Sequence, residues 1–176
     1  VADNRKKRKR SVNRSKSKIS KKPDTNWPIF KNRACLFNNY FYICMKAMIF
    51  AAGLGTRLYP YTADRPKALV EVAGKTLLER AILKVQEAGC SEIIINIHHF
   101  GQQIIDFLKQ KNNFGFKIHI SDERENLLDT GGGILKAAPL LTGNEPFLVY
   151  NVDIISNINL NELLQYHRSK GGLATL

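Results

Sequence analysis

Short apolar runs alternate with amphipathic stretches along residues 45–176, and turns that contain glycine or asparagine separate them. Strands that alternate with helices in this way predict an α/β fold, in which helices cover a mostly parallel sheet. Two runs, 93–95 and 147–149, are continuously apolar, which is typical of strands buried on both faces. Gly89 is expected to end the first helix. The pattern predicts strands near 46–52, 92–97, 116–121 and 146–150, and helices near 76–88, 101–111, 132–138 and 159–169.

Charge is divided unequally along the chain. The formal net charge is +12, but residues 1–45 hold 13 Lys and Arg against 2 Asp and Glu, whereas residues 46–176 hold 14 against 13. The basic character therefore belongs to a leader, residues 1–44, whose composition predicts disorder. Three interpretations of the leader stay open: an arm that binds RNA or an anionic membrane, a transit peptide, or translated upstream sequence. Met45, directly before the first strand, favours the third.

Neither a membrane span nor a disulfide framework is expected. The apolar patch at 34–44 is shorter than the ~20 residues that a spanning helix needs, and two asparagines interrupt it. The three cysteines, Cys35, Cys44 and Cys90, form no C-x-x-C pair and fit a reducing compartment. We therefore expect a cytoplasmic protein without a membrane partner, and binding of nucleic acid only through the basic leader.

The stretch from residue 48 to 74, MIFAAGLGTRLYPYTADRPKALVEVAG, carries the candidate chemistry. A strand ends near Ala51, Gly53 and Gly55 follow, and Arg57 and Lys67 supply two cations. Glycines let the backbone approach a polyphosphate closely, and cations neutralise it. The chain contains no Walker A loop, and its glycine turn departs from the G-x-G-x-x-G of a dinucleotide site. The stretch therefore predicts a triphosphate-binding turn of another kind.

This stretch, written A-A-G-x-G-T-R-L-x-P-x-T and R-P-K-A-L-V-x-V-x-G-K, resembles the sugar-phosphate nucleotidyltransferase family. The segments NIHHFGQQI at 96–104 and DTGGGILKAAPL at 129–140 share the resemblance, which covers residues 45–176. They are most similar to N-acetylmuramate-1-phosphate uridylyltransferases, and then to mannose-1-phosphate guanylyltransferase-like proteins. The resemblance implies a Rossmann-like, doubly wound sheet of the nucleotide-diphospho-sugar transferase type. It also implies transfer of a nucleoside monophosphate from an NTP to a sugar 1-phosphate, with release of pyrophosphate; UTP is favoured, and GTP or CTP are alternatives.

The resemblance further implies roles for individual residues. Arg57 would hold the departing β- and γ-phosphates, and Lys67 would stabilise the transition state as a point charge. Asp153, at the end of the fourth predicted strand, would hold Mg²⁺, although Val152 stands where the family has glycine. The residues expected to bind the nucleotide are Ala51, Gly53, Gly55, Thr56, Asp129, Thr130 and Gly131.

Three further expectations concern the second half of the chain. Asp129 or Thr130 should cap the helix that follows, and Glu123 and Arg124 are additional candidates for the base pocket. The last residues resemble the start of another strand, which suggests a C-terminally truncated domain whose second metal carboxylate lies beyond residue 176. The alternative function is therefore a non-catalytic, nucleotide-binding fragment of a larger protein.

Overall fold

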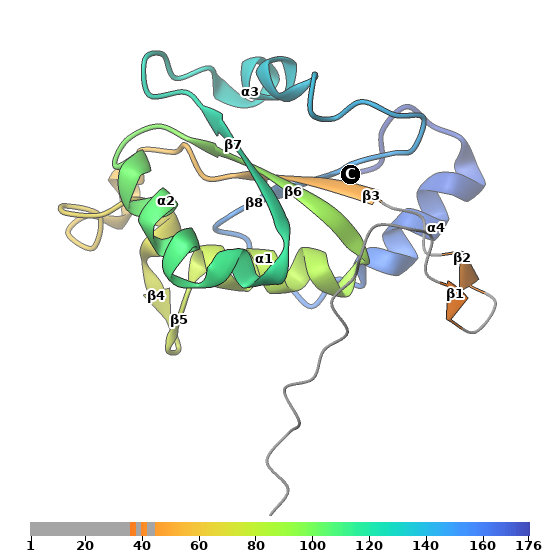
Figure 1. The fold of residues 1–176 in the computed structure, drawn as a ribbon, viewed down its shortest axis with the longest axis horizontal. Helices are drawn as coiled ribbons and strands as arrows, with labels where there is room; N and C mark the ends of the chain where they lie inside the picture. Colours follow the sequence, from red (N-terminus) through yellow and green to blue (C-terminus); the bar gives the residue numbers. More distant parts are fainter. Residues whose placement is uncertain (1–35, 38–39, 42–44) are drawn as a thin grey trace, which may run out of the picture. The chain divides into compact units, whose positions relative to one another are not determined.

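The computed structural model describes residues 36–37, 40–41 and 45–176 (Figure 1). Within the leader, Leu36–Phe37 (β1) and Tyr40–Phe41 (β2) pair as antiparallel strands. The sequence predicted disorder there, but the aromatic residues of these two pairs also favour strands. The rest of that prediction, the three interpretations of the leader, and Cys35 and Cys44 lie outside the described residues.

The main sheet contains four parallel strands in the order β7-β6-β3-β8. The earliest of them in the chain, β3, therefore lies inside the sheet, and the strand order reverses between β3 and β8. In open α/β sheets, ligands bind at this switch, beyond the carboxyl ends of the strands. The strands are β3 (Met45–Phe50), β6 (Cys90–Ile97), β7 (Lys117–Asp122) and β8 (Leu148–Asn151), which confirms all four predicted strands with small shifts at their ends.

Helices cover both faces of the sheet, which confirms the α/β prediction (Figure 1). Side chains of α1 (Leu77–Glu87), α2 (Gly101–Gln110) and α4 (Leu160–Lys170) pack into one core, and α3 (Asp129–Ala137) packs on the opposite face. No described helix has both the length and the apolar character needed to cross a bilayer. The smaller elements were not predicted: 3-10 turns η1 (Thr56–Leu58), η2 (Lys67–Leu69) and η3 (Asn112–Gly115), and the hairpin of β4 (Glu71–Val72) and β5 (Lys75–Thr76).

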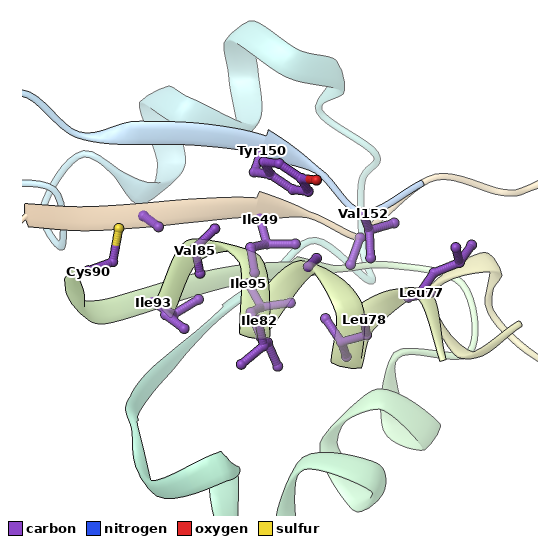
Figure 2. Close-up of a cluster of buried hydrophobic side chains, with 14 of the residues drawn as sticks. Ile49, Leu77, Leu78, Ile82, Val85, Cys90, Ile93, Ile95, Tyr150 and Val152 are labelled. Carbon is purple, nitrogen blue, oxygen red and sulfur yellow. The ribbon is translucent and has the colours of Figure 1, made fainter. Parts of the chain in front are cut away.

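Helix α1 shows why the apolar pattern produces this core. The Thr76 hydroxyl caps the helix by accepting from the Glu79 N–H at 3.1 Å, and Gly89, at φ 77°, follows its C-terminus as predicted. In Figure 2, side chains from α1 and from β3 and β6 gather in the space between helix and sheet. Each fully buried aliphatic side chain contributes roughly 1.5–3 kcal/mol. The buried side chains of α1 are Leu77, Leu78, Ala81, Ile82 and Val85.

The second continuous apolar run behaves differently from the first. Residues 93–95 are fully buried, as predicted, but Phe147 and Val149 are 39% and 40% exposed. The prediction of burial on both faces is therefore wrong for 147–149. The reason is the position of β8, which lies at the edge of the described sheet. Helix α3 packs instead on Met48 of β3 and Ile94 of β6.

Candidate functional site

The loop after β3 turns sharply at the carboxyl edge of the sheet. Ala51 is buried and Gly53 is exposed, with no neighbouring atom within 4 Å of the position that a Cβ would occupy. Gly55 adopts φ 70°, a left-handed conformation that is strained for other residues. The Gly55 carbonyl then accepts from the Leu58 N–H at 2.9 Å, which begins η1. The glycines thus leave an exposed stretch of backbone where the sequence predicted a phosphate-binding turn.

Gly55 also places this loop directly against the segment that carries Lys67. A Cβ at Gly55 would lie 2.9 Å from the Lys67 Cβ and 3.0 Å from the Thr62 methyl carbon. The Thr62 hydroxyl donates to the Gly55 carbonyl at 2.9 Å and holds the two segments together. Two parts of the motif that the sequence separates are therefore in contact.

Lys67 and Asp153 form an ion pair across the switch between β3 and β8. The Lys67 Nζ lies 2.5 Å from an Asp153 carboxylate oxygen, and the two side chains are 17% and 36% exposed. Lys67 begins η2, whereas Asp153 lies two residues after Asn151, the last residue of β8. The structure thus brings the expected phosphate lysine and the expected metal carboxylate to one point on the sheet edge.

Val152 takes no space from this ion pair. Its side chain is 4% exposed and packs in the core shared with α1 (Figure 2), and its N–H donates to the Phe50 carbonyl at 3.2 Å. Tyr150 supports the same turn, because its hydroxyl donates to the Ile154 carbonyl at 2.9 Å, and burial raises the pKa of that phenol. Valine in place of the family's glycine therefore anchors the turn that carries Asp153.

The chemistry of Asp153 fits a hard divalent cation only as one of several ligands. A carboxylate on the sheet edge is an oxygen ligand of the type that Mg²⁺ prefers. Within residues 45–176, no cluster of three or more His, Cys, Asp or Glu side chains is placed to hold a metal. Asp153 would therefore share the ion with phosphate oxygens, water or residues outside the described part of the chain.

Two predicted site residues lie on η1 and point to solvent. Thr56 and Arg57 are exposed, and η1 buries no residue. Among the described residues, the structure records no ion pair to Arg57. The side chain is therefore available to an anion at the glycine loop, and within the described part of the chain no ion pair holds it there.

The start of α3 differs from the expected cap. The residue before the helix is Leu128, neither Asp129 nor Thr130 makes a capping hydrogen bond, and Asp129 adopts φ 53°. The capping prediction is therefore wrong, because the left-handed backbone at Asp129 turns the chain into the helix without a side-chain cap. Asp129, Thr130 and Gly131 are all exposed at this helix start.

Glu123 and Arg124 were expected beside the base pocket, but the two side chains lie in different environments, since Glu123 is buried and Arg124 is exposed. Arg124 pairs with Asp122 at 2.5 Å, and this guanidinium holds the pKa of the Asp122 carboxyl below its usual value. Glu123 is fully buried and accepts a hydrogen bond from the Asn96 side-chain amide at 2.9 Å. Asn96 was not among the predicted site residues, although a polar residue at the end of an apolar strand could have indicated a role.

The parallel sheet, with a glycine loop at its switch point, defines an α/β protein, and similarity to known proteins identifies its family. The chain belongs to the nucleotidyl transferase family, whose model matches residues 46–176. It is 44% identical over 121 residues to the N-acetylmuramate alpha-1-phosphate uridylyltransferase of Neisseria meningitidis, covering 69% of this chain and 52% of that protein. It is 38% identical over 134 residues to a probable mannose-1-phosphate guanylyltransferase of Oryza sativa, covering 75% of this chain and 37% of that protein.

Solved structures agree with this result. HddC from Yersinia pseudotuberculosis, complexed with GMP-PN, superposes with a TM-score of 0.62 at 28% identity, over 70% of this chain and 54% of that one. The resemblance inferred from the motifs and the nucleotide-diphospho-sugar transferase type of fold are thereby confirmed. The chain spans about half the length of the curated uridylyltransferases that it matches.

Proposed function

We propose that this chain forms the nucleotide-binding part of a sugar-1-phosphate nucleotidyltransferase. The single observation that carries the proposal is the 2.5 Å contact between Lys67 and Asp153, beside the glycine loop at the switch of the sheet. An ammonium and a carboxylate at that point can serve a triphosphate, one by neutralising phosphate oxygens and the other by holding a cation. Family membership supports the same activity.

The proposed reaction is an in-line displacement. An oxygen of the sugar 1-phosphate forms a bond to the α-phosphorus of the nucleotide, and the bond from that phosphorus to the pyrophosphate oxygen breaks. Arg57 and Lys67 neutralise the charge that develops on the phosphate oxygens, and the backbone of the glycine loop positions those phosphates. Mg²⁺, when bound at Asp153, would add Lewis-acid neutralisation of the phosphates. The residues proposed to bind the nucleotide remain Ala51, Gly53, Gly55, Thr56, Asp129, Thr130 and Gly131.

Among nucleotides we propose UTP first. The Neisseria relative, at 44% identity, is named a uridylyltransferase, whereas the Oryza relative, at 38%, is named a guanylyltransferase. GTP is therefore the second candidate, and CTP the third, because a cytidylyltransferase from Streptococcus pneumoniae also shares the fold at 33% identity. The buried, unpaired Cys90 fits a reducing compartment, so we place the reaction in the cytoplasm.

The test is a pyrophosphate-release assay on the protein that carries this chain. Each of the four common NTPs is paired with a panel of sugar 1-phosphates, including N-acetylmuramate and mannose 1-phosphates, with Mg²⁺ present or chelated. We expect release that requires the sugar phosphate and is fastest with UTP. Binding of NTP without release in any combination would instead support the non-catalytic alternative.

A further inference from the structure

A buried polar pair lies beneath the glycine loop, where β6 and β7 end. Glu123 is fully buried and Asn96 is 2% exposed. The Asn96 amide nitrogen donates to Glu123 Oε1 at 2.9 Å. Asn96 Oδ1 in turn accepts from the backbone N–H of Ala51 at 2.7 Å and from that of Ala52 at 3.3 Å. One side-chain amide therefore connects a buried carboxylate to the first residues of the loop.

The same carboxylate reaches the segment that leads into α3. Its Oε2 accepts from the Leu128 N–H at 3.4 Å, directly before the helix. Gly133, within α3, approaches so closely that a Cβ there would lie 3.0 Å from Glu123 Oε1 and 3.4 Å from the Asn96 amide nitrogen. Asn96 and Glu123 thus join the loop after β3 to the start of α3.

Packing alone does not explain this choice of residues. Burying a carboxylate and an amide costs free energy that apolar side chains of similar volume would avoid. The pair makes hydrogen bonds that apolar residues cannot make. The Glu123 carboxylate accepts from the amide nitrogen of Asn96, and this orients the Asn96 amide oxygen toward the N–H groups of Ala51 and Ala52. These N–H groups follow the last residue of β3, where the chain leaves the sheet.

We propose that Asn96 and Glu123 are positioning residues of the nucleotide site. They hold the loop of residues 51–55 and the N-terminus of α3 at a set distance from each other. This distance would let one nucleotide contact the phosphate-binding loop and the base-binding helix start together. Neither side chain touches the nucleotide; both act through backbone groups. This inference rests on the proposed function, because it concerns the same nucleotide site.

The first measurement is amide hydrogen exchange, which needs no ligand. In Glu123→Leu and Asn96→Leu, we expect exchange at Ala51 and Ala52 to rise by about 10-fold or more while the β6 amides keep their protection. Glu123→Gln should stay near the wild-type rate, because a Gln oxygen still accepts from the Asn96 amide. If either leucine variant does not fold, Glu123→Gln still tests the pair, because its NH2 group cannot accept from the Leu128 N–H, and exchange at Leu128 should rise while Ala51 and Ala52 stay protected.

Ser121→Ala is the matched control. Ser121 is buried beside Asn96 in the sheet register, and its hydroxyl has no hydrogen-bond partner among the described residues. Removing it changes a buried polar group at the same level of the sheet but leaves the loop contacts in place. Exchange at Ala51 should therefore be unchanged in this variant.

The second measurement is binding of UTP and of GTP, each with Mg²⁺, to the same variants by calorimetry. We expect Kd to rise about 10-fold in the leucine variants, as for a displaced binding group, by less in Glu123→Gln, which loses only the bond from the Leu128 N–H, and little in Ser121→Ala. Unchanged exchange at Ala51, or exchange that rises equally throughout β6, would overturn the positioning role. Wild-type protein that binds no NTP would instead contradict the proposed function. The exchange data would still show whether Asn96 and Glu123 hold the loop after β3.

Discussion

The Lys67 ammonium lies 2.5 Å from the Asp153 carboxylate, and the backbone of Gly55 packs against the Lys67 side chain. Both partners come from segments that follow strands on opposite sides of the sheet's switch point. In this ion pair each charge neutralises the other. A polyphosphate with its cation would offer both groups new partners of the right sign, so under the proposed function we expect the pair to open when a nucleotide binds.

Replacing either proposed catalytic cation should slow the reaction without unfolding the protein. We expect Lys67→Met and Arg57→Met each to lower turnover by ~10²-fold or more, the scale for one electrostatic stabiliser. Pyrophosphate release at saturating substrates measures the effect. Lys75→Met is the control, because Lys75 lies on the surface 4.0 Å from Glu79. Near-normal rates in both test variants would contradict the assignment.

Removing the carboxylate at Asp153 should change the response to metal. In Asp153→Asn, the amide keeps the shape of the side chain but is a weaker ligand, so we expect the Mg²⁺ concentration for half-maximal rate to rise about 10-fold. A Mg²⁺ titration of the rate measures this shift. Asp64→Asn is the comparison, since Asp64 is exposed and paired with Arg65. An identical Mg²⁺ dependence in both variants would argue against a metal at Asp153.

Gly55 should tolerate no side chain. Gly55→Ala places a Cβ at φ 70°, 2.9 Å from the Lys67 Cβ, so we expect unfolding free energy to fall by about 1–2 kcal/mol from the backbone strain alone. Urea denaturation gives the value. Gly53→Ala, with no atom within 4 Å of the new Cβ, should change stability little. Equal stability of the two variants would contradict a left-handed, closely packed backbone at Gly55.

The salt bridge between Lys117 and Glu92 predicts a pH dependence of stability. Lys117, 2.9 Å away, holds the pKa of the Glu92 carboxyl below its usual value, while burial acts in the other direction. A carboxyl with a lowered folded-state pKa stabilises the fold above its unfolded-state pKa of about 4.3, and this stabilisation is lost as pH falls.

We therefore expect Lys117→Gln to be less stable than wild type at pH 6 by about 0.2–1 kcal/mol, as for an exposed pair, and to match it near pH 3. Urea denaturation at both pH values measures the difference. Lys109→Gln, on the exposed part of α2, is the charge-matched control. A difference that persists unchanged at pH 3 would mean that Lys117 acts through packing.

The sequence predicted the elements well because their signals are local. The period of α1, its glycine end and the apolar run 93–95 each lie within one element, and the structure confirms them. The failures share a different cause. Burial of Phe147 and Val149 depended on whether anything covers β8, and the cap at Asp129 depended on the backbone that leads into α3. Neither can be read within a short window of sequence.

The sequence by itself determined the family and the order of strands and helices along the chain, and it carries the residues that we propose meet a polyphosphate. Those properties reside in residue types and short spacings, from Gly53 and Gly55 to Arg57 and Lys67. Only the tertiary structure decided that Lys67 meets Asp153 and that Asn96 meets Glu123. Each contact joins residues far apart in the chain, and it exists because the strand order β7-β6-β3-β8 brings their loops to one edge of the sheet.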